Sequence, residues 1–137
     1  MRIPITILLI ISSICVFSQH KLTINLTNIA KVKGQVEICV YEEGKGFMNS
    51  SKAKACIWKE VLSNQLSHTF ENLPAGKYAA IVIQDLNGNK DLDTNFLRIP
   101  NEPYGFSTNP STTFGPPDFD GASFMIASDT EIRIELK

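Results

Sequence analysis

Apolar and polar residues alternate along much of the chain with the two-residue period of a β-strand. The clearest alternating segments are residues 21–27, 35–41 and 131–137. In the first of them Leu22, Ile24 and Leu26 share one side of the backbone, and threonine or asparagine occupies the other. Such alternation predicts a strand with one buried face. Residues 77–84 are almost continuously apolar instead, which predicts a central strand covered on both faces.

Three further segments show a weaker strand pattern, and helical patterns are scarce. The weaker strand segments are residues 52–58, 66–70 and 122–127. Residues 44–54 predict one helical turn, and elsewhere the sequence shows no convincing helical period with end caps. About seven short strands in one domain predict an all-β fold, a two-sheet β-sandwich of immunoglobulin-like or transthyretin-like type.

A long segment without a strand pattern lies between residues 84 and 122. It contains five prolines, four glycines and five aromatic residues. The aromatic residues are Phe96, Tyr104, Phe106, Phe114 and Phe119. A loop of this length is uncommon in a compact domain unless it is functional or disordered, and disordered segments are poor in aromatics. We therefore expect one long ordered loop, held by its aromatic residues against the end of the sandwich.

Residues 1–18 predict a signal peptide. A long apolar run follows Arg2, and Val16 and Ser18 occupy the small-residue positions before a signal-peptidase cut. The apolar run is too short to span a bilayer comfortably. We therefore expect a secreted or periplasmic protein without a membrane span, whose mature part, residues 19–137, is a single monomeric β-sandwich domain.

The charge of the predicted mature chain argues against two classes of partner. Without Arg2, the 13 basic residues become 12 against 14 acidic residues, a formal charge of −2. The basic residues do not cluster along the sequence. Nucleic acids and anionic membrane surfaces, which need basic clusters, are therefore not expected as partners.

Two cysteines, Cys39 and Cys56, belong to the predicted mature domain. In an oxidising compartment they could pair, and a bond closing a loop of this size would stabilise the fold by about 3 kcal/mol. Two separated cysteines can equally be two buried thiols, so the sequence leaves the disulfide open. His20 and His68 stand at no recognisable ligand spacing from them, so zinc is not expected.

Oxygen-bearing side chains occupy every second position of residues 85–93, the segment called the Asp/Asn loop below. They are Asp85, Asn87, Asn89, Asp91 and Asp93. Calcium takes six to eight oxygen ligands, so alternate side chains of one tight loop predict a calcium site. Phe96 stands where an EF-hand has its bidentate glutamate, and Glu102 could replace that ligand. We therefore expect weak binding, with a dissociation constant of about 10⁻⁴–10⁻³ M.

The same loop has an interpretation without a metal. Aspartate and asparagine side chains also accept hydrogen bonds from nearby backbone N–H groups, in Asx-turns that hold a loop together. These residues are among the commonest in turns. The sequence alone leaves the ion site and the turn network as alternatives.

Five segments of the chain are similar to a known family. They are residues 73–79 (LPAGKYA), 85–89 (DLNGN), 93–96 (DTNF), 99–107 (IPNEPYGFS) and 114–119 (FGPPDF). In this order they resemble DUF2141, a group of small exported bacterial proteins classified as a domain of unknown function. The resemblance covers nearly the whole mature chain. It implies a β-sandwich and an exported protein, and it implies no reaction.

The chain departs from the family pattern at Lys90, where a glycine is usual, and at Gln84, where a histidine often precedes the aspartate. Glycine is favoured at the sixth position of an EF-hand-like loop because the backbone there is left-handed. We expect Lys90 to strain the backbone by about 1 kcal/mol and to place a positive charge near the predicted ion.

Aromatic residues provide a second candidate binding site. The set is Trp58, Tyr104, Phe106, Phe114 and Phe119. They could form an exposed platform for a protein or a carbohydrate, or bury themselves as a small core beneath the long loop.

These patterns predict an exported, non-enzymatic binding or structural module of the cell envelope with a calcium-stabilised loop. A metal-free module that binds a carbohydrate or a protein through residues 96–119 is the first alternative. The second is an undescribed hydrolase with its site between the Asp/Asn loop and His68. No nucleophile with a recognisable motif accompanies that histidine, which disfavours the hydrolase.

Overall fold

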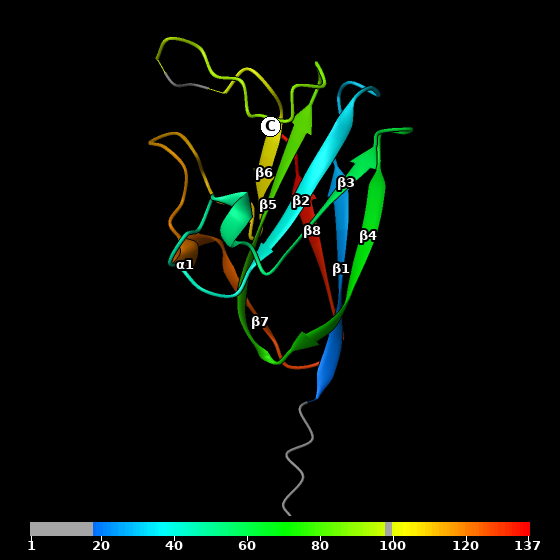
Figure 1. Cartoon of the computed structure of the whole chain (residues 1–137), viewed down its shortest axis with the longest axis vertical. Helices are drawn as coiled ribbons and strands as arrows, with labels where there is room; N and C mark the ends of the chain where they lie inside the picture. The colour runs from blue at the N-terminus through cyan, green and yellow to red at the C-terminus, as the bar shows by residue number, and fades with distance from the viewer. Residues whose placement is uncertain (1–17, 98–99) are drawn as a thin grey trace, which may run out of the picture.

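The computed structural model describes residues 18–97 and 100–137, and its strands form two sheets that pack face to face (Figure 1). The strands are β1 (Gln19–Thr27), β2 (Gln35–Tyr41), β3 (Ala55–Glu60), β4 (Leu66–Pro74), β5 (Gly76–Asp85), β6 (Tyr104–Phe106), β7 (Ser123–Ile126) and β8 (Thr130–Glu135). Two short helices, η1 (Ser50–Lys52) and α1 (Phe119–Ala122), complete the described elements. The predicted signal peptide lies outside the described residues, apart from Ser18.

One sheet has three strands in the order β4-β1-β8, and the other has five, in which β3-β2-β5-β6 are neighbours and β7 also pairs with β5. The β1–β8 pair is parallel, and the remaining pairs are antiparallel. This mostly β architecture agrees with the predicted β-sandwich. The immunoglobulin-like or transthyretin-like strand order stays a prediction.

The main core lies between the sheets and follows from the alternation in the sequence. Both sheets contribute fully buried aliphatic residues to it. From the three-stranded sheet come Leu22, Ile24, Leu26 and Ile134, and from the five-stranded sheet come Val36, Ile38, Val40, Val82 and Ile126. Burying each of these side chains contributes about 1.5–3 kcal/mol. The period of two therefore decides which face of each strand turns inward.

The long segment after β5 contains a strand that the sequence pattern does not reveal. Strand β6 has three residues, and its middle residue, Gly105, faces β8. A Cβ atom at Gly105 would lie 2.6 Å from Cγ2 of Ile134, so only glycine permits this approach. Backbone hydrogen bonds between Tyr104 and Lys137 join the two sheets at this point.

Two other predictions about the elements are confirmed. Strand β5 is central, because β2 pairs with one of its edges and β6 and β7 share the other, and most of its residues are buried. The helical turn expected within residues 44–54 is η1, which Asn49 caps by accepting a hydrogen bond from the backbone N–H of Ser51. None of the helices in the described ranges is long and apolar enough to cross a membrane.

Candidate functional site

The outer face of the five-stranded sheet is apolar, although such a face usually meets water and is polar. In β2 the residues at even positions enter the main core, so Glu37, Cys39 and Tyr41 point outward. We call this surface the pocket face. Its side chains are Glu37, Cys39, Tyr41, Trp58, Ile81, Ile83, Tyr104 and Phe106.

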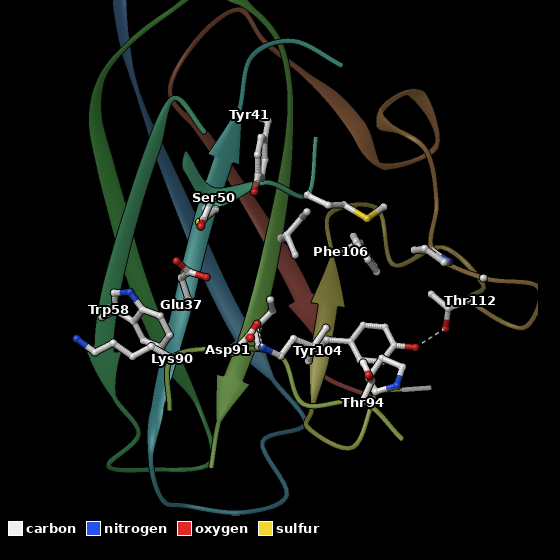
Figure 2. A pocket seen from close by; sticks show the side chains of 18 of the residues that line it. Glu37, Tyr41, Ser50, Trp58, Lys90, Asp91, Thr94, Tyr104, Phe106 and Thr112 are labelled. Atoms are coloured by element: carbon white, nitrogen blue, oxygen red, sulfur yellow. Dashed lines mark hydrogen bonds between the residues drawn. The ribbon is translucent and has the colours of Figure 1, made fainter. Parts of the chain in front are cut away.

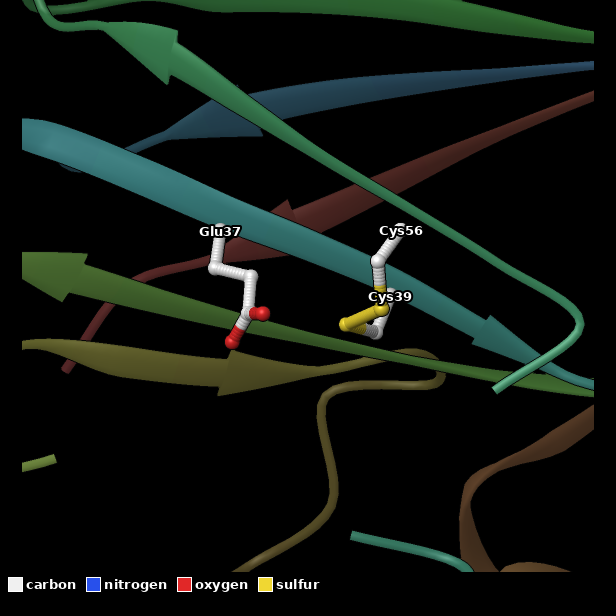
Figure 3. A group of neighbouring side chains, drawn as sticks. All are labelled: Glu37, Cys39 and Cys56. Atoms are coloured by element: carbon white, nitrogen blue, oxygen red, sulfur yellow. A yellow bond between two sulfur atoms is a disulfide. The ribbon is translucent and has the colours of Figure 1, made fainter. Parts of the chain in front are cut away.

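A disulfide bond joins Cys39 of β2 to Cys56 of β3 on the pocket face (Figure 3). The two residues are directly opposite each other in the antiparallel ladder, with their Cα atoms 4.2 Å apart. This pairing answers the question that the sequence leaves open, and it favours an oxidising compartment outside the cytoplasm.

Glu37 lies beside the disulfide (Figure 3). Its carboxylate oxygen and the two sulfur atoms lie within 4.8 Å of one another, the one such group of at least three Asp, Glu, His or Cys ligand atoms among the described residues. Because the sulfurs are bonded to each other, neither is a thiolate that could bind a metal. This group is therefore not a metal site.

Two loops stand beside the pocket face and turn it into a pocket. The first connects β5 to β6 and includes the Asp/Asn loop, and the second, residues 107–118, leads to α1 (Figure 1). Together with the sheet they enclose a pocket of about 660 Å³ (Figure 2). Loop residues that line it include Lys90, Asp91, Leu92, Thr94, Pro100, Thr112, Thr113 and Pro116. The long segment thus leaves the end of the sandwich and also borders the outer face of the five-stranded sheet.

Two polar groups of β2 face the pocket without a hydrogen-bond partner among the described residues, the Glu37 carboxylate and the Tyr41 hydroxyl. The Tyr41 side chain extends along the sheet toward Glu37 (Figure 2). Burial raises the pKa of the Glu37 carboxyl above its ordinary value. Burial and the negative charge of Glu37 together raise the pKa of Tyr41 to about 12. The pocket therefore combines apolar walls with two unpaired polar groups.

Lys90 and Trp58 form one edge of the pocket (Figure 2). The Lys90 ammonium nitrogen lies 5.9 Å from the centre of the Trp58 ring, at cation–π distance. Lys90 also has a positive φ of 60°, the left-handed conformation expected from its loop position. Lys90, which stands where the family usually has a glycine, therefore makes a contact that glycine could not make.

Backbone amides surround the carboxylate of Asp85. Its oxygens accept hydrogen bonds from the N–H groups of Asn87 at 3.1 Å, Gly88 at 2.7 Å and Lys90 at 2.8 Å. Burial alone would raise the pKa of Asp85, but the hydrogen bonds outweigh it and hold the pKa below its ordinary value. Asp85 is therefore an ionised anchor that organises the loop in the way an Asx-turn network does.

The other predicted metal ligands are also engaged within the loop. The side-chain amides of Asn87 and Asn89 donate to the Asp93 carboxylate, while their oxygens accept backbone N–H groups. The Glu102 carboxylate is buried and accepts from the N–H of Leu86 at 2.8 Å and of Asp93 at 3.2 Å. Asp91 accepts from the N–H of Leu92. The calcium site stays a prediction.

The aromatic residues of the long segment divide into two groups. Phe106 is buried, Tyr104 lines the pocket with its hydroxyl 3.1 Å from that of Thr112, and Phe119 packs edge-on against Phe47. These residues belong to a small second core, one of the two arrangements that the sequence leaves open. Phe96 and Phe114 are almost fully exposed instead, one on each of the two loops.

His68 lies away from this pocket, on the three-stranded sheet. It is opposite Ile24 in the β1–β4 ladder and its ring packs edge-on against Phe70 at 4.6 Å. Burial and the positive charge of Lys59 lower its pKa. It does not line the pocket, so the structure does not bring it together with the Asp/Asn loop.

Sequence reasoning identified some pocket residues and missed others. The sequence marks Tyr104, Phe106 and Trp58 as members of an aromatic set and Asp91 as a calcium ligand. It does not mark Glu37 or the outward-facing residues of β5. One signal was present: in 35–41 the outward positions include a cysteine and a tyrosine, so that face is not purely polar.

The comparison with protein families gives one match. A family model described as an uncharacterized protein conserved in bacteria (DUF2141) matches residues 24–134. The match runs from within β1 to within β8 and includes every residue that lines the pocket. No curated protein and no solved structure matches the chain. The resemblance noted in the sequence is confirmed, and the chain belongs to the DUF2141 family of bacterial proteins.

Proposed function

We propose that this domain is an exported, non-enzymatic binding module that takes a small, mainly apolar ligand in the pocket. The observation that carries the proposal is the apolar outer face of the five-stranded sheet, left partly uncovered by the loops beside it. A pocket of about 660 Å³ falls within the 300–1,000 Å³ typical of small-molecule sites. The disulfide and the predicted signal peptide support export.

The chemistry of the walls favours an apolar ligand over a carbohydrate. Apolar residues supply most of the sheet side of the pocket, as Ile81, Ile83 and Phe106 do. A sugar carries a hydroxyl on nearly every carbon, and each hydroxyl that loses water needs a new hydrogen-bond partner. The unpaired polar groups on β2, Glu37 and Tyr41, could satisfy only a few of them. The concave shape also suits a small molecule better than a flat protein surface.

The test uses Trp58, the chain's single tryptophan, which lines the pocket. Its fluorescence should change on titration with 4-phenylbutan-1-ol, a neutral apolar probe. The variant Ile83→Phe fills the pocket and should weaken binding about tenfold or more, since overfilling a packed site costs about 1–3 kcal/mol. Ser67→Phe, which adds the same ring at an exposed position of the other sheet, should bind normally. Equal binding by both variants would refute the proposal, and so would the lack of a saturable change with this probe and with its amine and carboxylate analogues.

The calcium-stabilised Asp/Asn loop predicted from the sequence is the alternative to a loop held by its own hydrogen bonds. The left-handed Lys90 and the three amides around Asp85 support it, because an EF-hand-like loop has the same sharp turn. The amide groups of Asn87 and Asn89 oppose it, because their NH₂ groups rather than their oxygens are directed at Asp93. Calcium binding would require both amides to turn over.

Thermal unfolding separates the two states of the loop. With a dissociation constant of about 10⁻⁴ M, 10 mM calcium would stabilise the fold by about 2.7 kcal/mol relative to excess EDTA. We expect no such difference, because the loop is held by its own hydrogen bonds. A clear rise in melting temperature with calcium that disappears in Asp93→Ala would contradict this expectation. It would show that calcium binds the Asp/Asn loop.

A further inference from the structure

We propose that the ligand of the pocket is an organic cation, a protonated amine carried by an apolar body, whose ammonium group pairs with Glu37. This inference rests on the proposed binding function and specifies the charge of the ligand.

Glu37 carries a negative charge that the described residues leave unpaired. The described part of the chain has three ion pairs, Lys21–Glu71, Lys54–Glu42 and Lys77–Asp120, and all of them lie outside the pocket. None of the hydrogen bonds of the described residues reaches the Glu37 carboxylate either, although that side chain is half-buried. A carboxylate removed from water favours a positive partner. The described residues do not provide one, and a positively charged ligand would.

The described surroundings of Glu37 offer no protein partner for that charge. Its neighbours in the sheet are the disulfide, Ile83 opposite on β5 and Trp58 opposite on β3. The remaining charged side chains that line the pocket are Lys90 and Asp91. The Lys90 ammonium makes no ion pair with Glu37 and lies over the Trp58 ring instead. Burial raises the pKa of the Glu37 carboxyl, which agrees with a charge that lacks a partner.

The aromatic residues around Glu37 suit a cation as well. The face of an electron-rich ring attracts an ammonium group, and the rings of Tyr41, Trp58 and Tyr104 all line the pocket. The Trp58 ring already holds one ammonium group, that of Lys90, which leaves the rings of Tyr41 and Tyr104 for the ligand. The Tyr41 hydroxyl can accept a hydrogen bond from the amine beside Glu37. The isoleucine side chains of β5 would contact the apolar body.

Three probes of similar shape and different charge test the proposal on the full mature protein. They are 4-phenylbutylamine, 4-phenylbutan-1-ol and 4-phenylbutanoate, titrated at pH 7 with Trp58 fluorescence as the readout. The amine should bind about tenfold more tightly than the alcohol, because a charge-assisted hydrogen bond is roughly twice as strong as a neutral one. The anion should bind more weakly than both. Glu37→Gln should remove the preference for the amine and leave the affinity for the alcohol nearly unchanged.

The control is Glu60→Gln, which makes the same change at the exposed end of β3, outside the pocket. It should keep the tenfold preference. Equal affinities of the amine and the alcohol in the wild-type protein would refute the cationic ligand. The proposal of an apolar binding site would be unaffected. Tighter binding of the anion, lost in Lys90→Met, would instead identify Lys90 as the charged contact. Failure of all three probes would overturn the proposed function itself.

Discussion

The outer faces of the two sheets differ in chemistry although they belong to one sandwich. On the three-stranded sheet the outward side chains are polar and bond to one another: the hydroxyls of Thr23 and Thr69 are 2.9 Å apart, and Asn25 donates to Glu131. We call this surface the polar face. On the five-stranded sheet the outward side chains are aliphatic and aromatic, a disulfide crosses them, and loops cover part of the surface.

This difference shows which surface of the protein needs an explanation. A polar outer face satisfies its own hydrogen bonds and meets water at little cost. An apolar outer face is costly in water unless something covers it. Here the two loops cover part of the pocket face, and the uncovered part is concave. The pocket face is therefore the surface where binding would provide the missing contacts.

Removal of the disulfide should have the largest effect on stability. The double variant Cys39→Ala, Cys56→Ala should lose about 3 kcal/mol of unfolding free energy, because the unfolded chain gains the entropy of an open loop. Denaturant unfolding measures it, with the wild-type protein under a reductant as the matched comparison. A loss below about 1 kcal/mol would mean that the disulfide contributes little to the stability of the fold, contrary to the entropic estimate.

Substitution of Asp85 should come next. Asp85→Asn leaves backbone amides around a neutral side chain, and we expect a loss of about 1–3 kcal/mol at pH 7. The folded pKa of Asp85 lies below its ordinary value, so its ionised form stabilises the fold above about pH 3.8. That contribution is lost as the pH falls through the folded pKa, where wild type and variant should converge.

The control for Asp85 is Asp91→Asn in the same loop. Asp91 is exposed and accepts one backbone N–H, that of Leu92, so its replacement should change stability by less than about 0.5 kcal/mol. Equal losses for the two variants, or an Asp85→Asn loss that is constant from pH 7 to pH 3, would contradict the role of Asp85 as an ionised anchor.

Two substitutions between side chains of similar shape, one on each outer face, compare the faces directly. Ile83→Thr puts a hydroxyl on the pocket face and should destabilise the fold by about 1–2 kcal/mol and weaken binding of the neutral probe. Thr23→Val removes a hydroxyl from the polar face and should change stability by about 0.5 kcal/mol at most. Urea unfolding measures both. Similar values for the two substitutions would mean that the faces do not differ energetically as their composition suggests.

The smallest effect is expected at Lys90. Lys90→Gly should relieve the left-handed backbone by up to about 1 kcal/mol and lose a cation–π contact of about 0.5–1 kcal/mol, so the net change should be small. In a Trp58→Leu background the contact is already absent, and the same substitution should then be clearly stabilising. A double-mutant cycle measures the coupling. Identical effects in both backgrounds would show that the ring contributes nothing to holding Lys90.

The strands were predictable because their pattern is local. In 35–41 every second residue is apolar, and β2 has those bounds. Residues 77–84 are almost continuously apolar, and most residues of β5 are buried. Strand β6 could not be predicted, because it has three residues and depends on Gly105 approaching Ile134, a contact between distant parts of the chain.

The candidate site was predictable only in part. The Asp/Asn loop and the aromatics at 104 and 106 stand out in the sequence because of their composition and spacing. Glu37 does not, since one glutamate on the outward side of an alternating strand is expected to meet water. It became a candidate when the fold placed it beside two loops that begin after β5 and after β6, much later in the chain.

The sequence by itself determined the strand faces and the family, because each depends on neighbouring residues or on motifs read in order. Only the tertiary structure decided that Cys39 pairs with Cys56 and that Glu37 shares a pocket with Trp58 and Tyr104. These contacts join strands and loops that are far apart in the sequence. The period of a strand sets which way a side chain points, but the pairing of strands sets what it meets.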